Sequence, residues 1–465
     1  MTAKNTRGQT AFEYLILVGG VIVLVLAVIY SLVSGVRKTN PIPEFEDVTF
    51  KEASLYIPLD NNTSPRCDSW INYAIIHDID DDNKSELLLI VTDRTNSPNG
   101  RARVLVYEQE ANFNARLSAE YDIDLTEDDI AEDFDVGDID GDGKDEIVVV
   151  GWYVHVASPQ SCSMNDSDSY GSFIYVLSYD ESTGIQEITS DSHRQQGERA
   201  YGLTLTDIDG DGKDECVVVK SGTQTGEDLY AYDCDKGISQ KWAVDIKFDP
   251  ATGDKFVSTR DVVAVGSTLY VYAIDDKFNK LYVAKVQNDG TVLRKKEIDE
   301  DPNVGIRASL RSISVVKGKV GIGWAAYSPT AKQAVYKISL LDPNTLDEEF
   351  NDTIKGQSNN FGFWNVGTPM EVKGILVFPF IDKYDTYIVR YSSDMSERFA
   401  LKVDNALYMY GCVYGDETGE WFEKSIVFPL FFAKTVNKLL PGGGFLVLEK
   451  HTIAAEIIKR GLQRI

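Results

Sequence analysis

Three short segments of this chain repeat one arrangement of acidic residues. They read DIDDDNKSE from Asp78, DIDGDGKDE from Asp138, and the same nine letters again from Asp207. Carboxylates fall at positions one, three, five and nine, and position seven offers a backbone carbonyl. Calcium takes about 6 to 8 oxygen ligands at about 2.3 to 2.6 Å, and so compact a loop can supply most of them. The spacing therefore predicts calcium as the cofactor, with about three ions bound.

The predicted ligands follow directly from these positions, and the lysine at position seven contributes only its backbone carbonyl. They are Asp78, Asp80, Asp82, Lys84 and Glu86 in the first loop, Asp138, Asp140, Asp142, Lys144 and Glu146 in the second, and Asp207, Asp209, Asp211, Lys213 and Glu215 in the third.

Position six must allow a sharp bend. Gly143 and Gly212 satisfy this requirement, whereas Asn83 in the first loop tolerates a left-handed backbone less well, so weaker binding is expected there. An EF-hand is excluded because the glutamate stands at position nine instead of twelve and a strand follows. Ordinary acidic turns are the alternative, but they would have to reproduce the same spacing three times.

The segments around the loops predict consecutive antiparallel strands. Each loop is followed by a run of β-branched and aliphatic residues, a turn and a second strand. The first aspartates of the loops are 60 and 69 residues apart (138−78 and 207−138). Similar units without the acids follow near Asp261, Arg311, Met370 and Ala406. We therefore predict an all-β fold over residues 47–465, a seven-bladed β-propeller whose ring is closed by the strand near Asp47.

The acidic loops resemble the FG-GAP or integrin α-type propeller repeats, in which a loop of this kind binds calcium within a blade. The resemblance covers residues 78–90, 138–150 and 207–219. It implies a structural role for calcium and a propeller face that binds a ligand, either a glycan, a protein or another surface.

Five cysteines are too few for a disulfide scaffold and too dispersed for a zinc site. Cys216 begins one predicted strand and Cys234 ends the next, so antiparallel pairing brings them close together. Two readings remain open for this pair, a disulfide in an exported protein or two buried free thiols.

The N-terminus carries an uncharged apolar run from Tyr14 to Val33, long enough to cross a membrane as a helix. A plain single-pass anchor is the main alternative to a more specific role. Two features favour a segment that is cleaved and pairs with a neighbouring subunit over a plain anchor. Gly8 and Gln9 lie before the apolar run, and Glu13 lies at its edge, where a carboxylate needs a partner. Cleavage between Gly8 and Gln9 would create an α-amino group that can neutralise Glu13 of a neighbouring subunit.

This pattern resembles the class III signal sequence of archaeal type IV pilins, on Gly8, Gln9, Glu13 and Leu17. The family prefers serine at the third mature position, where this chain has Ala11. The resemblance implies a leader over residues 1–8 that a prepilin peptidase removes. It also implies a membrane helix over 9–36 that packs with other pilin-like subunits, a linker over 37–46, and a propeller held outside the cell, at the membrane or in a surface filament.

The net charge of −27 argues against a nucleic-acid partner. No HExxH, GxSxG or phosphate-binding glycine motif is present, so no catalytic residue is predicted and the chain is not expected to be an enzyme. The expected function is a pilin-like subunit, minor or at a filament tip, that presents the propeller for adhesion or recognition. An uncleaved single-pass receptor or envelope protein is the alternative, and a glycan-active surface enzyme is the third.

Overall fold

The computed structural model divides the chain into two compact units, residues 1–45 and 46–465. The predicted leader, helix 9–36 and linker 37–46, with Gly8, Gln9 and Glu13, lie outside the described residues. The structure describes residues 49–53, 70–93, 101–110, 114–123, 128–155, 169–193, 198–221, 226–246, 257–275, 280–298, 305–307, 313–328, 333–356, 364–372, 374–382, 385–403, 406–408, 413–414, 425–432 and 443–449.

These residues form antiparallel sheets, and within the described ranges no helix occurs. Four sheets hold four strands each, consecutive in the chain and in space. They contain β2 (Trp70–His77), β3 (Glu86–Asp93), β4 (Arg101–Glu110) and β5 (Asn114–Ile123); β6 (Asp128–Gly137), β7 (Glu146–His155), β8 (Ser169–Asp180) and β9 (Gly184–His193); β10 (Arg199–Thr206), β11 (Glu215–Ser221), β12 (Leu229–Asp233) and β13 (Ser239–Val244); and β14 (Val257–Val265), β15 (Thr268–Asp275), β16 (Leu281–Gln287) and β17 (Val292–Ile298).

The remaining strands form sheets of the same kind with one additional short strand each. They are β18 (Gly305–Arg307), β19 (Ile313–Val316), β20 (Lys319–Ser328), β21 (Gln333–Leu341) and β22 (Glu348–Lys355); β23 (Trp364–Val366), β24 (Met370–Val372), β25 (Ile375–Asp382), β26 (Asp385–Tyr391) and β27 (Arg398–Val403); and β1 (Thr49–Ala53), β28 (Ala406–Tyr408), β29 (Val413–Tyr414), β30 (Ser425–Phe432) and β31 (Gly443–Glu449).

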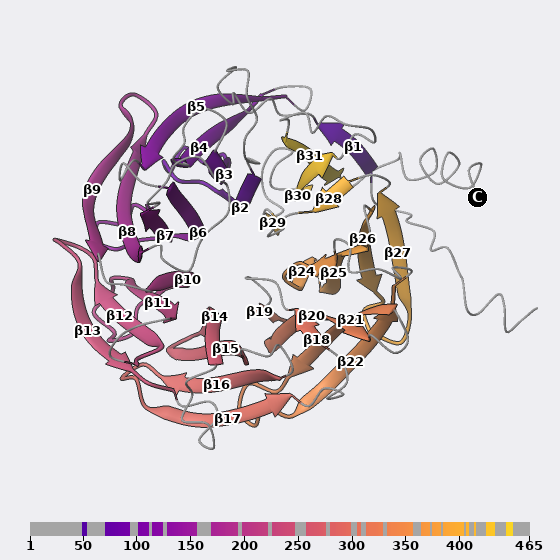
Figure 1. Cartoon of the computed structure of the whole chain (residues 1–465). Coiled ribbons are helices and arrows are strands. Elements are labelled where there is room, and N and C mark those ends of the chain that lie inside the picture. Colours follow the sequence, from indigo (N-terminus) through magenta and orange to yellow (C-terminus); the bar gives the residue numbers. More distant parts are fainter. Residues whose placement is uncertain are drawn as a thin grey trace, which may run out of the picture. The chain divides into compact units, whose positions relative to one another are not determined.

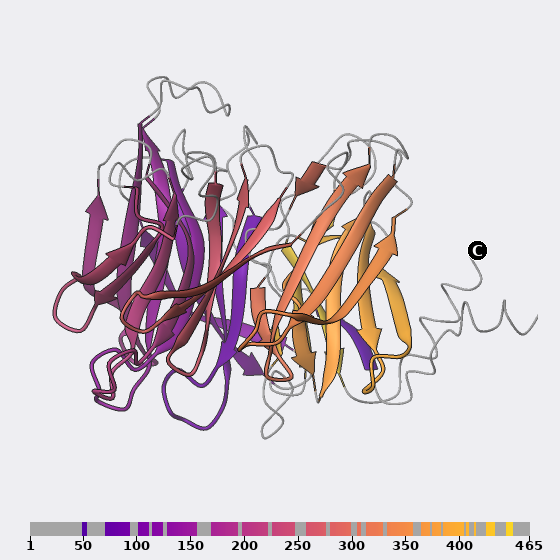
Figure 2. The same cartoon turned by 90° about the horizontal axis from the view of Figure 1, so that it is seen from below.

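The sheets of the unit formed by residues 46–465 follow one another around a common centre (Figure 1). The strands β2, β6, β10 and β14 are innermost, and β5, β9, β13 and β17 are outermost. Seen from the side, the strands run between two ends at which the connections lie (Figure 2). This arrangement is all-β and propeller-like, as the sequence predicted.

The position of a strand in its sheet explains its composition. The second strands are buried on both faces and therefore read as continuous aliphatic runs, such as Leu87–Val91 in β3 and Ile147–Val150 in β7, all at most 1% exposed. The outermost strands face water on one side. The sequence VLRKKEI of β17 is accordingly exposed at most positions.

Neighbouring sheets are joined by carboxylates that accept hydrogen bonds from an innermost strand. Asp133 Oδ2 accepts from Leu203 N at 2.8 Å, and Asp135 Oδ2 accepts from Leu205 N at 2.9 Å. The edge of β10 would otherwise present unpaired N–H groups. Burial is the main cause that raises the pKa of Asp135, to about 6.

The strand predicted near Asp47 is β1, and it pairs with β31 from the other end of the unit. The antiparallel register runs from Thr49 opposite Glu449 to Ala53 opposite Phe445. β30 of the same sheet contacts β2. This pairing agrees with the predicted closing role of the Asp47 segment, while the number of blades stays a prediction.

A disulfide joins Cys216 and Cys234, whose Cα atoms are 6.5 Å apart. Antiparallel pairing of β11 with β12 brings Cys216 opposite Tyr232, two residues before Cys234. Of the two possibilities that the sequence left open, a disulfide or two buried free thiols, the structure therefore has the disulfide.

Replacing both cysteines by serine is expected to lower the free energy of unfolding by about 3 kcal/mol, the value typical of a loop of this length. The bond closes a separation of 18 residues. Urea unfolding of the double variant, compared with the native protein in the presence and absence of a reductant, measures the effect. A native protein whose stability is unchanged by the reductant would contradict it.

Candidate metal centres

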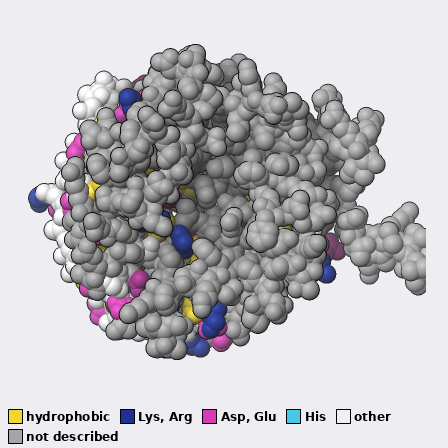
Figure 3. Space-filling view, in the orientation of Figure 1, with side chains coloured by type: hydrophobic (Ala, Val, Ile, Leu, Met, Phe, Trp, Pro, Cys, Tyr) yellow, Lys and Arg dark blue, Asp and Glu magenta, His cyan; other side chains and the backbone are white. Residues whose placement is uncertain are grey.

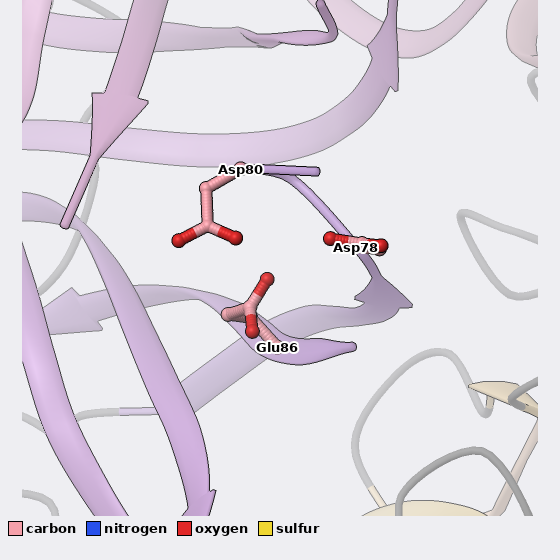
Figure 4. Close-up of side chains that lie close together, drawn as sticks. All are labelled: Asp78, Asp80 and Glu86. Carbon is pink, nitrogen blue, oxygen red and sulfur yellow. The ribbon is translucent and has the colours of Figure 1, made fainter. Parts of the chain in front are cut away.

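Three acidic clusters each bring three carboxylates together and could hold a metal ion. Their ligand-type oxygens all lie within 4.8 Å of one another in each cluster. Figure 4 shows the first, in which three carboxylates from one loop surround a common space. The clusters consist of Asp78, Asp80 and Glu86; Asp138, Asp140 and Glu146; and Asp207, Asp209 and Glu215. These residues are positions one, three and nine of the predicted loops.

Each loop is shaped by the same hydrogen bonds. In the second loop, Asp138 Oδ2 accepts from Gly143 N at 3.0 Å, Asp140 Oδ1 accepts from Asp142 N at 3.0 Å, and Glu146 Oε2 accepts from Ile139 N at 3.0 Å. The third loop repeats all three contacts, and so does the first. The acids that cluster therefore also fold the loop that carries them.

The backbone turns left-handed at two positions in every loop. Position six does so at Gly143 and Gly212, with φ of 87° and 86°, and at Asn83, with φ of 65°, as the sequence predicted. Position four does so as well, at Asp81, Gly141 and Gly210, which the sequence reading did not use. The first loop thus holds two non-glycine residues in this region, a conformation that costs them more than it costs glycine.

The position-five aspartates are not members of the clusters. Each instead accepts a hydrogen bond from the backbone N–H of the position-seven lysine: Asp82 from Lys84 at 2.7 Å, Asp142 from Lys144 at 2.8 Å and Asp211 from Lys213 at 3.0 Å. Metal ligation by these aspartates and by the lysine carbonyls stays a prediction.

Burial makes the position-nine glutamates resist ionisation. It is the largest cause that raises the pKa of Glu86 to about 8 and that of Glu146 to about 7, and the neighbouring aspartates of the same loop add to it. Glu215 is raised in the same direction. A bound cation would offset both the loss of hydration and the mutual repulsion of the carboxylates.

The third cluster differs from the other two because a lysine from a distant strand reaches it. Lys241 Nζ on β13 lies 2.6 Å from Asp209 Oδ2 and also pairs with Glu215. These carboxylates raise the pKa of Lys241. The sequence reading missed Lys241, which lies 26 residues beyond Glu215, and no local spacing marks it.

Replacing Lys241 by Met is expected to strengthen calcium binding at the third cluster by about tenfold, because a charge-assisted contact of this kind is worth about 1.5 kcal/mol. Calorimetric titration of the full chain with calcium measures the change. Lys236→Met, which alters an exposed lysine paired with Asp235 outside the cluster, is the matched control. Equal affinities in both variants would show that Lys241 does not compete with the ion.

The second loop contacts both the third loop and the end of β2 in the first sheet. Asp214 N donates to Asp138 O at 2.9 Å, and His77 at the end of β2 pairs with Asp145. A Cβ on Gly137 would lie only 2.5 Å from Asp214 Oδ2, so glycine permits the close approach of the two loops. An ion in one loop would therefore also steady its neighbour.

The comparisons with known proteins add little. No protein-family model matches the chain, and no curated protein matches its sequence. Solved structures that resemble it include the crystal structure of the major allergen Mala s 1 of Malassezia sympodialis. That similarity has a TM-score of 0.34 and 13% identity, and it covers 60% of this chain and 89% of the allergen. Among the described residues, none belongs to a helix with the length and apolar character needed to cross a membrane.

Proposed function

We propose that this chain is a pilin-like subunit of an archaeal surface filament, minor or at the tip, that displays a calcium-stabilised propeller for adhesion or recognition. The observation that carries the proposal is the order Gly8, Gln9 and Glu13 before the apolar run from Tyr14 to Val33. A simple anchor has no use for a carboxylate at the edge of its membrane segment, whereas a helix that assembles with others can pair it.

The proposal includes a seven-bladed propeller of the FG-GAP kind over residues 47–465. Support comes from the repeated four-stranded antiparallel sheets, from the pairing of β1 with β31, and from acidic clusters at the same place in three successive sheets. Calcium is the proposed ion because all the clustered ligands are carboxylates, which hard divalent cations prefer.

The size of the exported part favours a minor or terminal place in a filament. A body of about 420 residues is wide compared with one packed helix, so placing one beside every helix would need an extended linker. Extracellular display and attachment at the membrane are parts of the same proposal, and no catalytic role is included.

Mass spectrometry of the mature protein tests the processing step. Co-expressed with an archaeal prepilin peptidase, the chain is expected to begin at Gln9, because cleavage between Gly8 and Gln9 leaves the apolar helix on the product. The same chain expressed without the peptidase is the control and should keep its leader. A start at Met1 or Thr2 in the presence of an active peptidase would overturn the pilin proposal in favour of an uncleaved surface protein.

A further inference from the structure

The innermost strands of the four-stranded sheets share an irregularity that is unrelated to the acidic loops. Each contains a β-bulge near its beginning, between Ile71 and Tyr73 in β2, between Ala131 and Asp133 in β6, between Ala200 and Gly202 in β10, and between Thr259 and Asp261 in β14. The extra residues are Asn72, Glu132, Tyr201 and Arg260. A bulge that recurs at one place re-aims a side chain, and such bulges are common beside binding sites.

The side chains at three of these bulges belong to one chain of contacts that crosses three sheets. Trp152 Nε1 donates to Glu132 Oε1 at 2.6 Å, and the Arg199 guanidinium lies 4.7 Å above the Trp152 ring. The Arg260 guanidinium lies 4.8 Å above the Tyr201 ring. Arg199 and Tyr201 are themselves within 3.5 Å of each other. We call these five residues the inner-strand arginine cluster.

The cationic groups of this cluster are its two guanidiniums. Trp152 and Tyr201 are only 5% and 6% exposed, so their rings act as supports, whereas Arg199, Arg260 and Glu132 are half-buried. Stacking on an aromatic ring fixes the plane of a guanidinium and so orients the N–H groups on its edge. Arg260 Nε is buried and has no hydrogen-bond partner among the described residues. A buried donor of this kind calls for an acceptor beyond the described residues, and a bound ligand can supply one.

We propose that the inner-strand arginine cluster binds a ligand through a single carboxylate group. A guanidinium edge matches a carboxylate with two parallel hydrogen bonds. The net charge of −27, together with Glu132 in the cluster itself, disfavours anions that carry two charges, such as phosphate. The singly charged carboxylate therefore fits best.

The cluster lies away from the candidate metal centres. Asp207 lies six positions after Tyr201, just past the end of β10, which corresponds to about 20 Å of extended chain. Lys and Arg side chains are visible near the middle of the ring of sheets in Figure 3, which is consistent with the inner position of β10 and β14. The inference names a ligand chemistry for the recognition role proposed above and in that sense rests on it.

Calorimetric titration of the full chain in calcium tests the inference with D-glucuronate and N-acetylglycine, which present the same group on a sugar and on a peptide-like frame. At least one of them is expected to bind with a Kd on the order of 1 mM or below. The uncharged analogues, D-glucose and N-acetylglycine amide, should not bind. Tighter binding of glucuronate would assign the carboxylate to a sugar, and tighter binding of N-acetylglycine would assign it to a peptide. Either order of affinities supports the proposal.

Arg199→Gln and Arg260→Gln are each expected to weaken carboxylate binding at least about tenfold, as is typical for the loss of a charged hydrogen-bond donor. Arg398→Gln, which changes an arginine paired with Asp352 on the outermost strand of another sheet, should leave it unchanged. Arg260→Lys keeps the charge without the planar guanidinium and should weaken carboxylate binding several-fold. This variant tests the role of Arg260 if Arg260→Gln does not fold.

Binding of neither carboxylate, tighter binding of inorganic phosphate, or undiminished binding by the folded arginine variants would overturn the inference. These outcomes are independent of the processing test. If the chain starts at Met1 but binds a carboxylate, the pilin proposal fails and the carboxylate inference stands. If the chain starts at Gln9 but binds no carboxylate, the carboxylate inference fails and the pilin proposal stands.

Discussion

Calcium is expected to raise the free energy of unfolding of this protein by about 2.7 kcal/mol for each occupied cluster when the free ion is at 100 times its Kd. The physical reason is that an ion binds the folded loop and not the unfolded chain, since only the folded loop brings its three carboxylates within 4.8 Å of one another. Thermal or urea unfolding in calcium and in chelator measures the difference.

Asp140→Ala should remove the stabilisation that calcium gives through the second cluster. Asp209→Ala should remove the stabilisation that calcium gives through the third cluster. In chelator Asp140→Ala should unfold within about 0.5 kcal/mol of the native protein, because it loses one repelled carboxylate along with one loop hydrogen bond. Asp209→Ala also loses its ion pair with Lys241 and should cost up to about 1 kcal/mol more in chelator. Asp394→Ala is the control: that carboxylate accepts hydrogen bonds in an exposed turn outside the clusters. Its effect should be the same with and without calcium, and identical melts of the native protein under both conditions would refute the calcium assignment.

Replacing Lys220 by Met is expected to lower the free energy of unfolding by about 3 to 5 kcal/mol, the usual cost of leaving a buried charge without its partner. Lys220 Nζ on β11 lies 2.7 Å from Glu198 Oε1, and their side chains are 1% and 7% exposed. Ser172 Oγ also donates to Glu198 at 2.8 Å. The ammonium group stands over the rings of Tyr230 and Tyr232, at 4.9 and 5.2 Å.

The double variant Lys220→Met with Glu198→Gln should recover most of this loss, because it no longer buries an unpaired charge. Lys280→Met, at an exposed pair with Glu297, is the matched control and should cost at most about 1 kcal/mol. Urea unfolding of the native protein, Lys220→Met, Glu198→Gln and the double variant gives the coupling energy of the pair. Additive effects of the two substitutions would mean that the ion pair contributes nothing of its own.

Features set by local spacing could be predicted from the sequence. The loop acids at positions one, three and nine cluster because a tight turn leaves nine consecutive residues few ways to fold. The left-handed bends at Gly143 and Gly212 were predicted for the same reason, and the glycines at position four, Gly141 and Gly210, were an equally local signal that could have been used. Strand pairing next to a turn likewise placed Cys216 beside Cys234.

Features set by contacts between residues far apart in the chain could not be predicted. Lys241 reaches the third cluster from another strand, and Lys220 meets Glu198 across 22 residues. The arginine cluster joins Glu132 to Arg260 through three sheets, and only the packing of the innermost strands brings these residues together. Charge, burial and spacing along the chain carry no information about which strand end faces which.

The pairing of β1 with β31 has a mechanical consequence. Tension applied to the chain before Thr49 enters the sheets through β1, which is held to β31 by the five residue pairs from Thr49–Glu449 to Ala53–Phe445. A pull along β1 loads these hydrogen bonds together, as a shear, instead of opening them one at a time. In the filament role proposed above, the pairing of β1 with β31 is thus the element that would carry the force on an attached cell.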